Sequence, residues 1–153
     1  MVKITADQIR RLRDETGAPI ANVKKTLEEF DGDEKKALEL LKKEGFEKAE
    51  KRVDRVTSQG IVANYIHHSG KIGVMVEVLC ETDFVARNEL FTKLGRDIAM
   101  QVSFSDPANL EALLNEDFIK DSSKKISDLV KEVIAKTGEN IRVGRFSRIE
   151  LGK

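Results

Sequence analysis

The sequence predicts an α+β protein: an N-terminal three-helix bundle joined to a three-stranded antiparallel sheet packed with helices. Apolar residues recur at helical spacing through residues 1–46, alternate along residues 60–81, and return to helical spacing from Asn88. This order of helices, two strands, more helices and a last strand favours an α+β class. We therefore expect a three-helix domain over 1–46, a charged linker over 47–59 and an α+β core domain over 60–153.

Composition excludes several functional classes. The 153 residues carry 27 Lys+Arg and 27 Asp+Glu, so there is no net basic field for direct nucleic-acid binding. No run of about 18 apolar residues is present, which predicts no membrane span. The start of the chain lacks an apolar signal region, and the single cysteine, Cys80, allows no intramolecular disulfide. These features predict a cytoplasmic protein.

Local signals mark the ends of the three N-terminal helices. Thr5 and Gln8 form a capping-box pattern, and Gly17 ends the first helix. Pro19 suits the first turn of the second helix, and the turn 31–33 caps the third. A bundle of this size is only marginally stable by itself, so we expect a tethered binding module.

The linker and the first two strands follow. Residues 47–58 are almost wholly polar, and their acidic side chains interrupt the basic ones, so a solvated connector is favoured over a nucleic-acid contact. Alternation predicts strands over 61–68 and 72–81, joined by a turn at 69–71. Every second residue of the second strand, from Ile72 to Cys80, is expected on the buried face.

The second half of the core reads as helices and one strand. Asn88 is expected to cap a long helix that stops at the pair Asp106 and Pro107. The remaining elements are a short helix over 108–114, an irregular connection over 116–125, a helix over 123–137 and a third strand over 140–151. Gly144 is expected to host a bulge, because Phe146 is out of phase with the preceding apolar residues.

Asp83 and Phe84 are the most informative pair. They follow the second strand where a helix should begin, and a strand end is a rigid place from which to present side chains. Phe84 is either a core residue that covers the sheet edge or an exposed aromatic anchor for a partner. The adjacent carboxylate of Asp83 favours the anchor.

Catalytic motifs are missing from the sequence. Adjacent residues on a strand point to opposite faces, so His67 and His68 cannot chelate one metal together. A small thiol enzyme that uses Cys80 beside one of these histidines is an open alternative, although a cysteine in an apolar strand is more often inert. We expect a protein that is not an enzyme and needs no cofactor or metal.

Three blocks of the chain resemble the elongation factor Ts family, and together they span nearly all of it. The first reads Ile-Arg-Arg-Leu-Arg-Asp-Glu-Thr-Gly-Ala-Pro over 9–19, and the second runs from Gly60 to Phe91 with Thr-Asp-Phe-Val-Ala-Arg-Asn at 82–88. The third covers 130–141, with Thr-Gly-Glu-Asn-Ile at its end. The second block is long and specific.

The resemblance implies a guanine-nucleotide exchange factor for elongation factor Tu, which binds the GDP form and promotes GDP release. The signature residues that would disturb the partner's magnesium and phosphate site are Thr82, Asp83, Phe84 and Val85. In the helical module, the residues that occupy the matching turn and helix start are Gly17, Ala18, Pro19, Ile20 and Lys24.

This chain departs from the family pattern at three places. Ile20-Ala21-Asn22 stands where the family commonly has Met-Met-Asp, Gln101 stands where many members have histidine, and the segment 103–125 is shorter than usual. Longer members carry two related sheet subdomains, and this chain has one. The resemblance thus implies a homodimer, with a monomer that engages its partner through one face as the alternative.

Two further interpretations stay open. Residues 4–46 resemble a ubiquitin-associated-like bundle, which is a generic module for recognising other proteins. A factor that binds elongation factor Tu but exchanges nucleotide poorly is the other.

Overall fold

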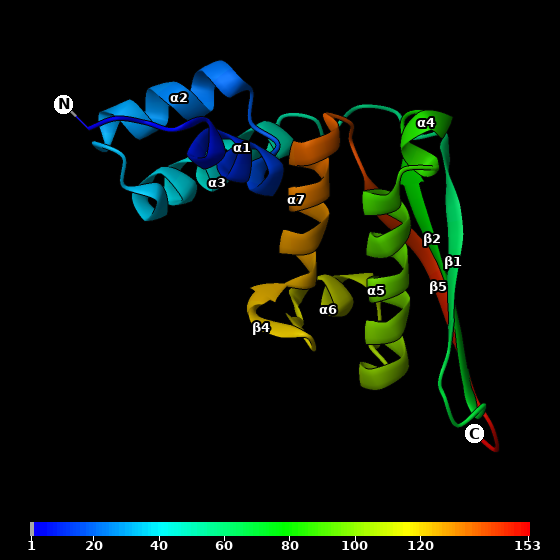
Figure 1. The fold of residues 1–153 in the computed structure, drawn as a ribbon. Helices are drawn as coiled ribbons and strands as arrows, with labels where there is room; N and C mark the ends of the chain where they lie inside the picture. Colours follow the sequence, from blue (N-terminus) through cyan, green and yellow to red (C-terminus); the bar gives the residue numbers. More distant parts are fainter. Residues whose placement is uncertain (1) are drawn as a thin grey trace.

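The computed structural model describes residues 2–153 and arranges them in successive layers (Figure 1). Met1, the first residue of the predicted N-terminal domain, lies outside the described residues. From left to right, Figure 1 shows the three N-terminal helices, α7, α5 and the sheet. The helices are α1 Ala6–Thr16, α2 Ile20–Glu29, α3 Glu34–Glu50, α4 Asp83–Ala86, α5 Glu89–Ser105, α6 Leu110–Asn115 and α7 Ile126–Thr137. The strands are β1 Gln59–Ile66, β2 Ile72–Cys80, β3 Asp117–Phe118, β4 Asp121–Lys125 and β5 Arg142–Glu150. The predicted α+β class is confirmed.

The predicted start and end of α1 and the predicted start of α3 are confirmed. Thr5 and Gln8 make both bonds of a capping box on α1, and Gly17 closes that helix in the left-handed region with φ 72°. Asp33 accepts hydrogen bonds from the first turn of α3. Pro19 stands one position earlier than expected, because it is the N-cap of α2 and not part of its first turn.

Helix α3 joins two hydrophobic cores. Its first half carries Ala37 and Leu41 into the core of the N-terminal helices. Its last turn extends into the segment expected as a linker and buries Ala49 in the larger core around the sheet. The spacing of four residues repeats along one helix face, which explains how a mostly polar stretch keeps one buried contact. The division into domains at residues 46 and 60 stays a prediction.

The main sheet is antiparallel with the order β1-β2-β5. Strand β2 is central, and Val74, Val76, Val78 and Cys80 are buried on the face that meets α5 and α4 (Figure 1). β1 starts and ends two residues earlier than predicted, because His67 already belongs to the turn and donates its backbone N–H to the carbonyl of Ile72. The expected bulge is confirmed: Gly144 and Arg145 lie together opposite Glu77, between the pairs Val76–Phe146 and Val78–Val143.

The prediction of an irregular connection over 116–125 is wrong. These residues form the two-stranded β3–β4 hairpin at the lower end of α7 in Figure 1. The hairpin was missed because β4 is polar and mostly exposed, so it shows no apolar alternation.

The ends of the neighbouring elements also differ from prediction. Asn109 caps α6, so this helix begins two residues later than expected. Helix α7 begins at Ile126, three residues later than expected, where the carboxylate of Asp128 accepts the backbone N–H of Lys125. Strand β5 lies within the predicted range 140–151.

Among residues 2–153, the structure contains no helix with both the length and the apolar character that a membrane crossing requires.

Candidate partner-binding site

The signature residues form a tight corner between β2 and α5. Thr82 is extended and caps the single turn of α4, where its hydroxyl oxygen accepts the backbone N–H of Val85 at 3.4 Å. Asn88 then caps α5 by accepting the backbone N–H of Leu90 at 2.8 Å. Two successive caps within seven residues leave the chain between them little conformational freedom.

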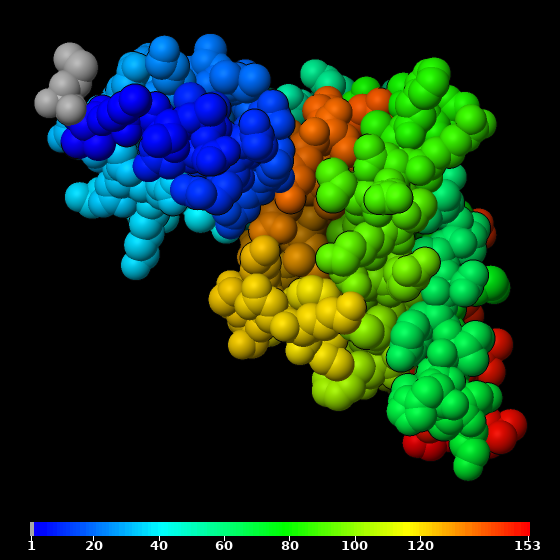
Figure 2. Space-filling model, viewed as in Figure 1, coloured from blue at the N-terminus to red at the C-terminus, as the bar shows by residue number. Residues whose placement is uncertain are grey.

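Asp83 and Phe84 point outward from this corner. Phe84 is 81% exposed, so it is not a core residue that covers the sheet edge, while its role as an anchor for a partner stays a prediction. Asp83 is also exposed, and its ion pair with Arg87 at 3.3 Å lies in solvent. Such surface pairs contribute little, so the Asp83 carboxylate is available to a partner. Figure 2 shows α4 at an upper corner of the molecule, unobstructed on this side.

Thr82 and Val85 face the protein instead. Val85 is partly buried against the main core, and Ala86 beside it is buried. The Thr82 hydroxyl donates to Glu139 Oε2 at 2.6 Å, and the Thr82 carbonyl accepts from the Cys80 thiol at 3.1 Å. The polar groups of Thr82 are thus engaged within the chain, so its geometry favours support of the loop over direct contact. A partner contact by either residue stays a prediction.

Glu139 is a residue at this site that the motif analysis did not select. It directly follows Gly138, which ends α7, and it lies behind the signature corner. Its Oε1 accepts the backbone N–H groups of Glu81 at 3.1 Å and Thr82 at 2.9 Å. The only sequence signal was its place in the third block of family resemblance.

The N-terminal candidates divide into two groups. Ile20 and Lys24 lie four residues apart on α2, and both are exposed. Gly17 instead packs on the end of α7: a Cβ atom at this position would lie 2.6 Å from the Lys136 Cα atom. The outward surface is therefore formed by α2, while the turn itself anchors the helices to the core.

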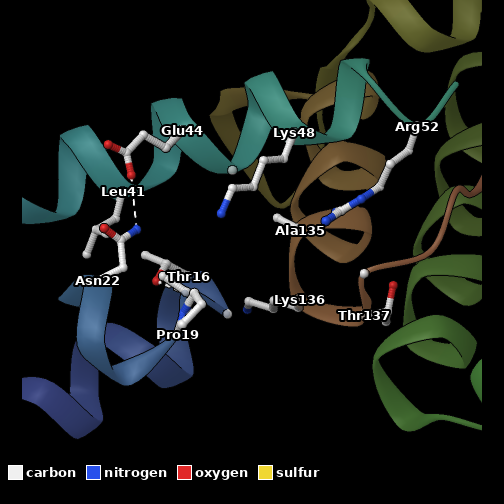
Figure 3. A pocket seen from close by; sticks show the side chains of 14 residues that line it. Thr16, Pro19, Asn22, Leu41, Glu44, Lys48, Arg52, Ala135, Lys136 and Thr137 are labelled. Atoms are coloured by element: carbon white, nitrogen blue, oxygen red, sulfur yellow. Dashed lines mark hydrogen bonds between the residues drawn. The ribbon is translucent and has the colours of Figure 1, made fainter.

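A pocket of about 240 Å³ lies where the N-terminal helices meet α7 (Figure 3). The turn residues Gly17, Ala18 and Pro19 line one side of it. Figure 3 shows Lys48 and Lys136 extending toward that turn from α3 and α7, while Asn22 donates to Glu44 at 3.1 Å. Gly17–Pro19 lie toward the same end of the core as α4 (Figure 1).

The geometry opposes a thiol enzyme. Cys80 pairs with Gln59 at one end of the β1–β2 hairpin, and His67 and His68 lie at the turn at the other end. Burial, followed by the nearby Glu139 carboxylate, raises the pKa of the Cys80 thiol, which disfavours the reactive thiolate. The structure therefore contradicts the alternative of a thiol enzyme that uses Cys80 beside a histidine, and it agrees with the expectation of an inert cysteine. Within the described residues, no group of three or more His, Cys, Asp or Glu side chains could hold a metal ion.

Comparison with known proteins gives the family. A family model described as Elongation factor TS matches residues 81–153. Elongation factor Ts of Oleidesulfovibrio alaskensis is 39% identical over 197 residues, with 99% of this chain and 100% of that protein covered. Elongation factor Ts of Solidesulfovibrio magneticus is 38% identical, with 100% and 99% covered, and that of Thermotoga maritima is 38% identical, with 99% and 98% covered.

The chain belongs to the elongation factor Ts family, which places it among the elongation factors of protein synthesis. It is shorter than these relatives: an aligned length of 197 against 153 residues leaves at least 44 positions with no counterpart here. The expected difference in length is confirmed, and its assignment to the segment 103–125 stays a prediction.

Proposed function

We propose that this chain is the guanine-nucleotide exchange factor of elongation factor Tu, and that it binds the GDP form and promotes GDP release. The observation that carries the proposal is the outward presentation of Asp83 and Phe84 from a doubly capped corner at the end of β2. An aromatic residue that is 81% exposed on a rigid corner is poorly explained by folding and well explained by a partner pocket.

The physical basis is negative coupling between two ligands of the same partner. A factor that binds nucleotide-free elongation factor Tu more tightly than the GDP form must weaken GDP binding by the same factor. Phe84 would enter a pocket that opens as the nucleotide site rearranges, and the Asp83 carboxylate would compete for groups that hold magnesium and phosphate. The only interactions that change are those of elongation factor Tu with GDP and magnesium. The chain itself would therefore need no cofactor and perform no chemistry.

A second contact supports the first. Ile20 and Lys24 present an apolar and a cationic group on the outer surface of α2. Binding by the N-terminal helices would keep the factor on its partner while the signature corner disturbs the nucleotide site. Once one of the two linked contacts has formed, the other forms at high effective concentration. This makes the N-terminal helices more important for affinity and α4 more important for the maximal rate.

The direct test is the release of a fluorescent GDP analogue from elongation factor Tu with and without the chain. We expect strong acceleration by the wild type and a loss of about tenfold or more in Phe84→Ala, since buried aromatic anchors contribute about 2 kcal/mol or more. Asp83→Asn should also slow release, because it removes the charge while preserving the shape of the side chain.

Phe104→Ala is the matched control, because Phe104 is another exposed aromatic, 70% accessible, at the far end of α5. Equal losses in Phe84→Ala and Phe104→Ala would contradict a specific site. A folded wild type that binds elongation factor Tu without accelerating release would instead support a factor that binds but exchanges poorly. A folded wild type that neither binds elongation factor Tu nor accelerates GDP release would refute the proposed partner.

We also propose that the protein acts as a homodimer through the outer face of its sheet. Ile66, Gly73 and Ile149 lie side by side across the three strands, and both isoleucines are largely exposed. Met75 and Val62 extend this apolar surface. A second copy of the chain would cover it and supply the second sheet that longer family members carry in one chain.

A further inference from the structure

The carboxylates of Glu81 and Glu139 link the end of β2 to the loop between α7 and β5, behind the signature corner. Glu139 accepts three hydrogen bonds from the end of β2: the backbone N–H groups of Glu81 and Thr82, and the Thr82 hydroxyl at 2.6 Å. Glu81 makes a hydrogen bond in the opposite direction: its Oε1 accepts the backbone N–H of Asn140, next to Glu139, at 2.7 Å. Each of the two adjoining loops is therefore held by a side chain of the other.

The same hydrogen-bond network includes the segment that follows the N-terminal helices. The Asn140 side chain, which is buried, donates to the carbonyls of Val53 at 3.2 Å and Arg55 at 2.9 Å. Arg55 in turn donates to the Gly138 carbonyl at 3.2 Å and pairs with Glu81 at 3.5 Å. The segment after α3, the α7–β5 loop and the signature corner thus form one hydrogen-bonded unit.

Glu139 bonds to the residue from which α4 starts. Thr82 is its N-cap, so the orientation of the Thr82 backbone fixes where Asp83 and Phe84 project. Hydrogen bonds from backbone N–H groups to a carboxylate are about twice as strong as neutral ones. Removal of the carboxylate would leave two N–H groups without an acceptor and free the corner to rotate.

We propose that Glu139 is a positioning residue of the exchange site, whose carboxylate holds Thr82 so that Asp83 and Phe84 meet the partner in the productive orientation. This inference rests on the proposed exchange function. It assigns to Glu139 an effect on nucleotide release without any contact with the partner.

The experiment compares Glu139→Ala and Glu139→Gln with the wild type in the full chain. GDP release is measured over a range of factor concentrations, so that the maximal rate is separated from the concentration that gives half of it. Amide hydrogen exchange of Glu81 and Thr82 is followed by NMR in the free chain. Glu132→Ala is the control, because Glu132 is another partly buried carboxylate, and its ion pair, with Lys124 at 3.0 Å, involves no residue of the corner.

We expect Glu139→Ala to lower the maximal rate about tenfold, as expected for loss of a hydrogen bond to a charged group, with a smaller change in the half-maximal concentration. Glu139→Gln keeps one acceptor oxygen at the same distance and should recover much of the rate. Protection of the Glu81 and Thr82 amides should fall only in Glu139→Ala. Glu132→Ala should preserve both the rate and this protection.

Unchanged amide protection in a folded Glu139→Ala variant would overturn the inference, whatever its exchange activity. Loss of amide protection together with a wild-type maximal rate would also overturn the inference, since nucleotide release would then not need the hydrogen bonds of Glu139. An inactive wild type would refute the proposed function instead, and the amide protection would still decide whether Glu139 holds the corner. The two failures are therefore distinct.

Discussion

The Gln101 side-chain oxygen accepts the backbone N–H of Ile119 at 2.9 Å and so ties α5 to the β3–β4 hairpin. Gln101 is 2% exposed. Its amide group donates to the Asp117 carbonyl and to the Glu116 carboxylate, both at 3.1 Å. Helix α5 therefore carries a buried amide at this position, which is hydrogen-bonded to a short polar hairpin.

Replacement of Gln101 should destabilise the protein. Gln101→Leu preserves size but leaves the Ile119 N–H and the Asp117 carbonyl without their partner, so we expect a loss of about 2–3 kcal/mol in the free energy of unfolding. Gln59→Leu is the control, because Gln59 is exposed at the start of β1. Urea denaturation of both variants is the measurement, and equal stabilities would contradict a structural role for the Gln101 amide.

Gly17→Ala should weaken the attachment of the N-terminal helices to the core. The new Cβ atom would lie 2.6 Å from Lys136 Cα and 3.1 Å from the Ala135 carbonyl oxygen, in addition to the strain of φ 72°. Gly138→Ala separates these causes, since Gly138 ends α7 at φ 78° and, apart from its own chain neighbours, nothing lies within 4 Å of the added Cβ. We expect about 1–2 kcal/mol for Gly138→Ala and a larger loss for Gly17→Ala.

Thermal unfolding gives the two losses, and small-angle scattering shows whether the N-terminal helices move away from α7. If Gly17→Ala loses no more stability than Gly138→Ala, the contact of the turn with α7 can shift without reducing the free energy of unfolding. The turn would then not fix the N-terminal helices against the larger core.

The helix ends could be predicted from the sequence because their signals are local. The Thr5–Gln8 capping box, the Asp33 and Asn88 caps and the closing glycines 17 and 138 each act within about one helical turn. The alternation of β2 was equally informative, since a central strand packed on one face must bury every second residue.

The elements that were not predicted depend on contacts between distant residues. Glu139 is 57 residues from Thr82 in sequence, and nothing near either residue signals the pair. The hairpin at 117–125 is bonded to Gln101, 18 residues before Ile119, and its own exposed polar strand carries no apolar alternation. The exposure of Phe84 was undecided because an aromatic residue at a strand end suits a sheet edge as well as a partner.

The Glu77–Arg145 pair should make stability depend on pH in the acid range. Arg145 donates from its side chain and its backbone, and these bonds lower the pKa of the Glu77 carboxyl from 4.5 to about 2. A carboxyl with a lowered folded-state pKa stabilises the fold above its unfolded pKa and loses this contribution as pH falls through the folded pKa. The contribution should be complete above pH 4.5 and should disappear toward pH 2.

The measurement is urea denaturation of the wild type and Glu77→Gln at several pH values. Glu77→Gln should be less stable near neutral pH, and the difference should shrink as pH falls below 4.5. Asp121 and Glu150 also have lowered pKa values, but both remain in the two proteins, so the difference isolates Glu77. A difference that is independent of pH would show that the pair does not stabilise the bulge through its charge.

A charge on the outer face of the sheet should disrupt the proposed homodimer. Met75 is 58% and Ile149 71% exposed on this face, and an aspartate at either position would place a carboxylate where the second copy packs. We expect sedimentation equilibrium to show a dimer for the wild type and a monomer for Met75→Asp and Ile149→Asp. Val56→Asp, at an exposed position in the segment between α3 and β1, should remain a dimer. A monomeric wild type that still accelerates GDP release would refute the dimer and favour one copy that engages its partner through a single face.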